Sequence, residues 1–317
     1  MSLETEFQTS PKEFAGKYAF YPEDKAAGYV PQHEQQLTIG KFKGFRHTVV
    51  DQARGIARVQ LNKGMHNVRG EVVMIQPSLT TTVGLPVYFL PWDRRGAAVE
   101  LTIPNADPAL PEHQHPRFFF TAVLSGCSIM FKGTPQNPTI FHCGTGGVGV
   151  DEVPTQGDSN QFFLELLNRL STFGIGTVGP VVQQLRSDQY MVPRLGSPAK
   201  DQLEKDVNKA MEALYKQRVK MVNTTAWGVV FGFRAQDSRD WKFYMQQNVT
   251  IQFYEMHDVL QTVVKKKLGG LIKTTKQVNT RQQGAFYNGA KPIELTRVFP
   301  GGGVAKATTA WKAIRGG

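Results

Sequence analysis

The sequence predicts an α+β fold in which packed sheets are flanked by helices. Strand-like segments cluster on either side of two amphipathic helices, first between residues 72 and 124 and again between residues 226 and 254. Hydrophobic residues make up 40% of the 317 residues and charged residues 20%, with 31 Gly and 18 Pro. This composition is typical of a loop-rich globular protein, and it excludes a coiled coil, a collagen and a disordered acidic chain.

The first half of the chain is expected to supply four strands, which are bounded by Pro and Gly or alternate between apolar and polar residues. They are residues 72–75, 85–90, 99–103 and 117–124. The last of these is nearly all apolar. A continuous apolar run of that length indicates a strand that is covered on both faces.

Two helices are expected in the middle of the chain. Residues 158–170 begin with the capping residues Asp158 and Ser159 and place their apolar side chains on one stripe. Residues 197–214 begin with Ser197 as the cap and Pro198 at the first helical position. Strand patterns return at residues 226–233, 241–245 and 249–254, with a hairpin loop at residues 235–240.

Positive charge is concentrated at the C-terminal end. Residues 256–317 hold eight Lys and three Arg against Asp258 and Glu294, which accounts for +9 of the formal charge of +11. Such a segment either contacts nucleic acid, an anionic lipid surface or an acidic protein, or is simply a solvated face. We therefore divide the chain into an N-terminal extension (residues 1–60), a central domain (residues 61–255) and a basic C-terminal extension (residues 256–317).

The two cysteines, Cys127 and Cys143, do not make a disulfide framework, which favours a reducing compartment. Residues 124–131 and 139–144 flank a turn rich in Gly, Pro and Asn, so they are expected to form an antiparallel hairpin. If the numbers of facing residues sum to 269, Cys127 faces His142 with their Cβ atoms about 5 Å apart. A neighbouring imidazole can accept the thiol proton, so this pair is a candidate nucleophile and base for acyl transfer.

A competing register pairs residues whose numbers sum to 270 and therefore places Cys127 opposite Cys143. Adjacent residues of a strand face opposite sides, so only one of His142 and Cys143 can face Cys127 in a regular ladder. A disulfide is thus the alternative to the Cys–His pair. Gly126, directly before Cys127, permits backbone geometry that lets a substrate carbonyl approach main-chain N–H donors.

The segment Leu124-Ser125-Gly126-Cys127 resembles the LSGC signature of the catalytic-domain family of cytotoxic necrotizing factor and Burkholderia lethal factor, which are glutamine deamidase toxins. In that family a His downstream of the Cys is its catalytic partner, and His142 occupies the matching position. Thr121 corresponds to the Thr of the lethal factor's Cys-His-Thr triad, and Phe89-Leu90-Pro91-Trp92 is similar to its Leu-Pro-Trp segment. The resemblance is good over roughly residues 85–170.

The resemblance implies a β-sandwich-like core of two mixed sheets with surrounding helices and long loops, and it makes residues 61–255 the catalytic domain. It implies a protein glutamine deamidase with Cys127 as nucleophile, His142 as acid and base, and Thr121 as the orienting residue. Leu124, Ser125 and Gly126 would support the motif and the oxyanion. The implied partner is a host protein, either a Rho-family GTPase or a DEAD-box translation-initiation helicase. The resemblance also implies that this chain is a secreted or injected bacterial protein that acts in the host cytoplasm.

Two alternatives remain open at this point. The same acyl-enzyme could serve a transglutaminase or a cysteine protease. A non-enzymatic module could instead bind an anionic surface through the basic C-terminal segment.

Other motifs in the chain are weaker. Residues 144–149 satisfy G-x-G-x-x-G, but the residues that follow are a poor helix start, so no cofactor is expected. His113 and His115 lack a well-spaced third ligand and are followed by Pro116, so no metal is expected. No apolar run approaches the roughly 18 residues of a membrane span, and residues 1–14 lack the pattern of a Sec signal peptide.

Overall fold

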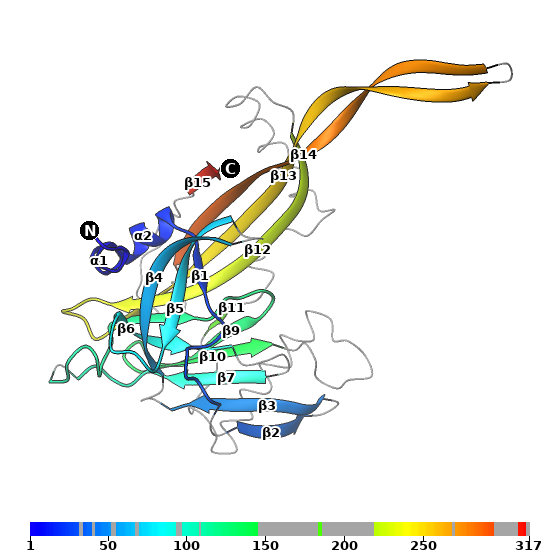
Figure 1. The fold of residues 1–317 in the computed structure, drawn as a ribbon. Helices are drawn as coiled ribbons and strands as arrows, with labels where there is room; N and C mark the ends of the chain where they lie inside the picture. Colours follow the sequence, from blue (N-terminus) through cyan, green and yellow to red (C-terminus); the bar gives the residue numbers. More distant parts are fainter. Residues whose placement is uncertain are drawn as a thin grey trace.

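The described part of the chain is mostly β-structure arranged as two mixed sheets (Figure 1). The computed structural model describes residues 1–31, 34–39, 42–51, 55–66, 70–92, 97–107, 109–144, 183–185, 219–267, 270–294 and 310–314. The helices among these residues are two short ones, α1 (Leu3–Thr9) and α2 (Pro11–Lys17). The expectation of two mixed sheets is confirmed, and the helices expected at residues 158–170 and 197–214 lie outside the described residues.

The first sheet has nine strands in the order β1-β5-β4-β6-β8-β12-β13-β14-β15. Two neighbouring pairs, β1–β5 and β6–β8, are parallel, and the other pairs are antiparallel. The strands are β1 (Phe20–Pro22), β4 (Ile56–His66), β5 (Gly70–Ser78), β6 (Leu85–Leu90), β8 (Phe118–Thr121), β12 (Val219–Arg234), β13 (Trp241–Lys267), β14 (Gly270–Glu294) and β15 (Ala310–Ile314).

The second sheet has six strands in the order β11-β9-β10-β7-β3-β2. Its β3–β7 pair is parallel, and the other pairs are antiparallel. The strands are β2 (Glu34–Ile39), β3 (Phe42–Val50), β7 (Ala97–Thr102), β9 (Ser128–Gly133), β10 (Pro138–Gly144) and β11 (Gln183–Leu185).

Strands β6 and β8 are buried on both faces and separate two hydrophobic cores. Alternate residues point to opposite sides of a strand, so each strand feeds both cores in turn. Val87, Phe89, Phe118 and Phe120 belong to a first core that includes the N-terminal helices, and Tyr88, Leu90 and Phe119 belong to a second core between the two sheets. The expectation that the run 117–124 contains a strand covered on both faces is therefore confirmed.

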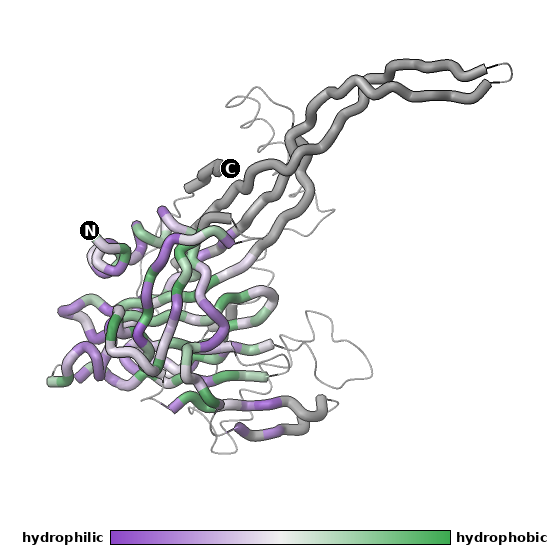
Figure 2. The backbone as a smooth tube through the Cα atoms, in the orientation of Figure 1, coloured by the Kyte–Doolittle hydropathy of each residue, from purple (hydrophilic) through white to green (hydrophobic). Residues whose placement is uncertain are grey.

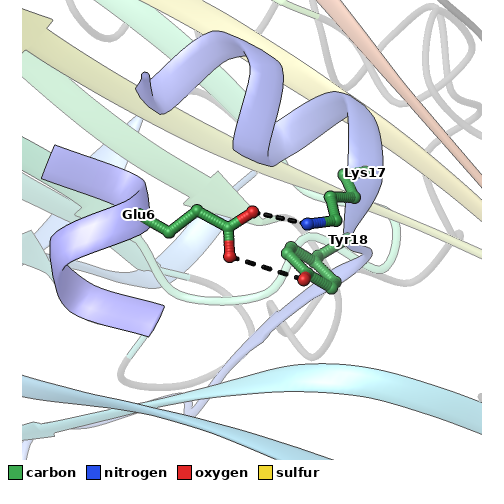
Figure 3. Close-up of polar contacts among 3 residues, drawn as sticks. All are labelled: Glu6, Lys17 and Tyr18. Atoms are coloured by element: carbon green, nitrogen blue, oxygen red, sulfur yellow. Dashed lines mark hydrogen bonds and ion pairs between the residues drawn. The ribbon is translucent and has the colours of Figure 1, made fainter. Parts of the chain in front are cut away.

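Both N-terminal helices pack their aromatic side chains into the first core. The Ser2 hydroxyl caps α1 by accepting a hydrogen bond from the Thr5 N–H at 3.2 Å, and Pro11 occupies the first turn of α2. Between the helices, Lys17 Nζ donates to Glu6 at 2.6 Å and the Tyr18 hydroxyl lies 3.5 Å from the same carboxylate (Figure 3). These contacts fix the angle at which the helix pair covers the core.

Phe7 is the centre of this packing. Its ring is fully buried and lies between 5.2 and 6.1 Å from the rings of Phe14, Phe20, Phe118 and Phe120. Residues 1–60, treated above as an extension, thus contribute directly to a core that also contains β6 and β8, although the domain boundaries themselves stay a prediction. Figure 2 shows hydrophobic stretches distributed along the strands of the body.

The remaining strand expectations fall within longer elements. Residues 72–75 lie in β5, and residues 99–103 overlap β7. The patterns at residues 226–233, 241–245 and 249–254 belong to the long strands β12 and β13, which are joined by a loop at residues 235–240 as expected.

The β13–β14 hairpin extends away from the two-sheet body (Figure 1). Residues 265–267, which are three consecutive lysines, pair with residues 270–272 at its far end. The tightest cluster of basic residues is therefore carried at the tip of a two-stranded arm. Among the described residues, no helix is long and apolar enough to cross a membrane.

We expect Phe7→Ala to lower the free energy of unfolding by about 3–5 kcal/mol, because it removes a buried ring and leaves a cavity among four others. Val83 is 65% exposed, and Val83→Ala is the control, with an expected change within about 0.5 kcal/mol. Urea denaturation followed by circular dichroism measures both. An equally small effect of Phe7→Ala would mean that the N-terminal helices are not part of the cooperative core.

Candidate active site

The β9–β10 hairpin places the candidate catalytic residues at one end of the second sheet. Gly133 pairs with Pro138 and Ser128 with Cys143, so facing residues sum to 271. Both registers considered above, with sums of 269 and 270, are therefore wrong. The reason is the turn: Thr134 and Asn137 exchange backbone hydrogen bonds at 3.2 and 3.3 Å, which leaves Pro135 and Gln136 as the two central residues.

In this register His142 pairs with Ile129, and Cys127 lies directly before β9. A regular ladder continued by one residue would place Cys127 opposite Gly144 and make it a diagonal neighbour of His142. Diagonal neighbours in an antiparallel pair lie about 7–8 Å apart. Cys127 packs against the second core, which also contains Ile129, consistent with this alternation.

Cys143 lies on the other face of the sheet. Burial raises the pKa of its thiol well above the ordinary value, and the nearby Cys127 and Glu100 raise it further. Both cysteines carry thiols, with Cys127 partly exposed and Cys143 fully buried. The disulfide alternative is therefore not formed, and Cys127 is the accessible thiol of the two.

His142 is fully buried, and its imidazole is neutral. Burial lowers its pKa to about 3, because removing a charged ring from water is unfavourable. Among the described residues, neither ring nitrogen has a hydrogen-bond partner. Such an unpartnered buried polar group costs roughly 1–3 kcal/mol, so its retention calls for an explanation.

Trp92 covers the imidazole. The two rings lie 4.6 Å apart with an interplanar angle of 31°, and a Cβ added at Gly144 would overlap the same indole. Gly144 is thus required for the ring to sit there. The sequence predicts Trp92, in the Leu-Pro-Trp segment, as a core or sheet-face residue, and the structure shows that it stacks on His142.

Thr121 ends β8 and anchors the strand to β12. Its hydroxyl accepts a hydrogen bond from the Val230 N–H at 3.1 Å, and the side chain is fully buried. No hydrogen bond among the described residues joins Thr121 to His142. Its contribution here is to position the end of β8, from which the following loop departs.

The loop after β8 carries the Leu-Ser-Gly-Cys segment. Leu124 exchanges two backbone hydrogen bonds with Gly228, each of 2.8 Å, and its side chain is buried in the second core. Ser125 and Gly126 are exposed. Gly126 has a φ of +124°, which favours glycine, and a Cβ added there would meet nothing within 4 Å. The backbone beside Cys127 is therefore open to an approaching group.

The two motifs that sequence analysis set aside can also be placed. His115 is buried and bonded to Tyr88 and Arg234, whereas His113 is exposed. Within the described ranges no group of three or more His, Cys, Asp or Glu could hold a metal ion. Gly144 ends β10, and the rest of the segment 144–149 lies outside the described residues.

Comparison with known proteins gives little support beyond this geometry. No family model matches the chain, and no curated protein matches it. Among solved structures the chain is similar to the C-terminal domain of CNFy from Yersinia pseudotuberculosis, a necrotizing factor, with a TM-score of 0.22 and 9% identity. The match covers 69% of this chain and 76% of that one. A likeness at this level is too weak to carry a conclusion about fold or activity.

We expect iodoacetamide to alkylate one thiol in the native protein, that of Cys127, because Cys143 is fully buried with a raised pKa. Peptide mass spectrometry identifies the modified residue. Cys143→Ala should still take up one label and Cys127→Ala none. Labelling of Cys143 before unfolding would contradict the burial described here.

We expect His142 to make the protein less stable in acid. Above its unfolded-state pKa of 6.5 the residue is neutral in both states, whereas towards pH 3 only the unfolded chain binds the proton. The free energy of unfolding should therefore fall by up to about 1.4 kcal/mol per pH unit across this window. His142→Phe should remove that part of the slope in urea titrations at several pH values, and the exposed-site control His113→Phe should keep it. An unchanged slope in His142→Phe would contradict a buried neutral imidazole.

Proposed function

We propose that the protein is a cysteine-dependent glutamine deamidase that acts on a host protein. The observation that supports this most is the presence of a partly exposed thiol, Cys127, and a buried imidazole without a described partner, His142, at the same end of the β9–β10 hairpin. Unpartnered buried polar groups are concentrated at functional sites, because selection otherwise removes them. The resemblance of residues 124–127 to the LSGC signature supports the choice of reaction.

In the proposed reaction His142 accepts the Cys127 proton. Burial disfavours the imidazolium, but the thiolate formed beside it supplies the opposite charge that stabilises it. The approach needs the Cys127 side chain to turn across the diagonal towards His142. Catalytic hydrogen bonds often tighten only when the substrate binds, so the proposed role does not need the two groups to be bonded in this structure.

The Cys127 thiolate then attacks the side-chain carboxamide carbon of a glutamine. Main-chain N–H groups around Gly126 and Cys127 would stabilise the oxyanion of the tetrahedral intermediate, which is why an open backbone at Gly126 matters. His142 gives its proton to the departing nitrogen, and ammonia leaves. Water, deprotonated by His142, hydrolyses the thioester, and the glutamine has become a glutamate.

Leu124 and Thr121 support the proposed site through hydrogen bonds with the backbone of β12. Leu124 holds the loop to β12 through its two hydrogen bonds with Gly228, and Thr121 holds the preceding strand through Val230. We assign Thr121 a positioning role in place of direct contact with the imidazole. Ser125 is exposed beside the thiol and would contact the substrate.

The target is proposed from the resemblance alone. It would be a Rho-family GTPase or a DEAD-box translation-initiation helicase, reached in the host cytoplasm after secretion or injection. The three lysines at the tip of the β13–β14 hairpin would supply an additional contact with an anionic surface.

We expect wild-type protein, incubated with a host-cell lysate, to convert one glutamine of a host protein to glutamate and to release ammonia. Cys127→Ala should abolish both by removing the nucleophile, whereas Cys143→Ala, which changes the other cysteine, should retain them. Quantitative proteomics and an ammonia assay measure the two products.

Other outcomes would redirect the assignment. Joining of the target to an added amine would indicate a transglutaminase, and cleavage of a peptide bond a protease. Host-protein binding that survives in Cys127→Ala and is lost at high salt would indicate a binding module that uses the basic hairpin. Conversion that survives in Cys127→Ala would overturn the role of this cysteine.

A further inference from the structure

A cavity of about 660 Å³ lies away from the candidate active site, beside the segment that joins β7 to β8. That segment leaves β7 after Thr102, which pairs with Thr139 at the start of β10, whereas His142 lies near the end of β10. The two sites are thus at opposite ends of the β7–β10 pair. A volume of this size is within the range of about 300–1,000 Å³ that small-molecule sites occupy.

A buried hydrogen-bonded chain of three side chains forms part of this region. Tyr88 and His115 line the cavity, and the Tyr88 hydroxyl lies 3.1 Å from His115 Nδ1. On the other side of the ring, Arg234 Nη1 lies 3.1 Å from His115 Nε2. Tyr88 is fully buried, and the other two residues are at most 7% exposed.

The chemistry of the three groups fixes where the protons lie. A guanidinium can only donate, so His115 Nε2 accepts from Arg234 and carries no proton. His115 is neutral, because burial and the neighbouring Arg234 lower its pKa, so its proton is on Nδ1 and is donated to the Tyr88 oxygen. The Tyr88 hydroxyl proton is then left to donate elsewhere, and no acceptor for it is found in the part of the chain that the structure describes.

The hydrogen-bond donors around the cavity favour an occupant with an acceptor group. Arg58 lines the wall and donates one bond, from Nη1 to the Gly84 carbonyl at 3.0 Å, which leaves its other N–H groups available. Arg234 lies behind His115 and has no carboxylate within ion-pair distance in the described ranges. Asp107 is the acidic residue of the wall, but it is exposed and accepts from the Ala109 N–H. His113 is also exposed at this wall.

The rest of the wall is apolar. Ile56, Ala57 and Leu79 contribute to it, and Leu110, which is 43% exposed, lies at its rim. An occupant therefore needs both an apolar body and an acceptor group. A carboxylate suits the donors available, since it accepts from a hydroxyl and from a guanidinium at the same time.

We propose that this cavity binds a small organic carboxylate, which accepts a hydrogen bond from the Tyr88 hydroxyl and pairs with Arg58 while its hydrocarbon part packs on Ile56 and Leu79. The inference is independent of the proposed deamidase reaction. It uses none of the residues assigned to that reaction.

The test is isothermal titration of the full chain with benzoate, phenylacetate and hexanoate, each compared with its neutral amide. At least one carboxylate should bind wild type, with its amide at least about tenfold weaker. Tyr88→Phe keeps the ring but removes the donor, and it should weaken carboxylate binding about tenfold, as should Arg58→Gln. Tyr21→Phe, on β1 and outside the cavity wall, is the matched control and should bind like wild type.

Circular dichroism and melting curves establish that each variant is folded. Cys127→Ala should bind the carboxylate like wild type, so a failure of the deamidase assignment leaves this result unaffected. Absence of binding by all three carboxylates at millimolar concentration would overturn the proposal. Equal binding of acid and amide, or wild-type affinity in folded Tyr88→Phe and Arg58→Gln, would overturn it as well.

Discussion

The burial of β6 and β8 on both faces is the constraint on which the rest of the structure depends. Because their side chains alternate between two cores, these strands are almost entirely apolar, with the Tyr88 hydroxyl as a hydrogen-bonding group within β6. Trp92 and Thr121 stand at or just beyond their C-terminal ends, and His115 stands just before β8. Several of the polar and aromatic residues discussed above therefore lie at the ends of this apolar pair.

The two-residue turn between β9 and β10 decides which residues of that hairpin face one another. Pro135 and Gln136 occupy the central positions of the β9–β10 turn, and this choice sets a sum of 271 for the whole ladder. Moving the register by one residue would turn Cys143 towards the core and His142 away from it. Gly144 makes room for the Trp92 indole that covers the His142 ring.

The sequence was informative where a single physical pattern dominated. The continuous apolar runs at β6 and β8 predicted buried strands, and the Cys–His hairpin was predicted as a hairpin. The register of this hairpin was not predicted, because the residues between 132 and 138 are compatible with turns of several lengths. The backbone hydrogen bonds between Thr134 and Asn137 select one of them. The packing of Phe7 and Phe14 in the core was missed because two-turn helices show too little periodicity. The burial of His142 and the Tyr88–His115–Arg234 chain depend on contacts between residues far apart in sequence.

The two buried imidazoles, His115 and His142, differ in their hydrogen bonding, and this difference is the basis for proposing different roles for them. Both are neutral because burial penalises the charged ring, yet His115 uses both nitrogens, one towards Arg234 and one towards Tyr88. A ring held from both sides cannot exchange a proton without breaking a bond, so it serves to orient a donor. His142 has no such bonds within the described chain, so a proton added to its ring would break no hydrogen bond, although burial opposes the charge. In the roles proposed here, the unsatisfied ring takes part in the reaction and the satisfied ring orients a binding group.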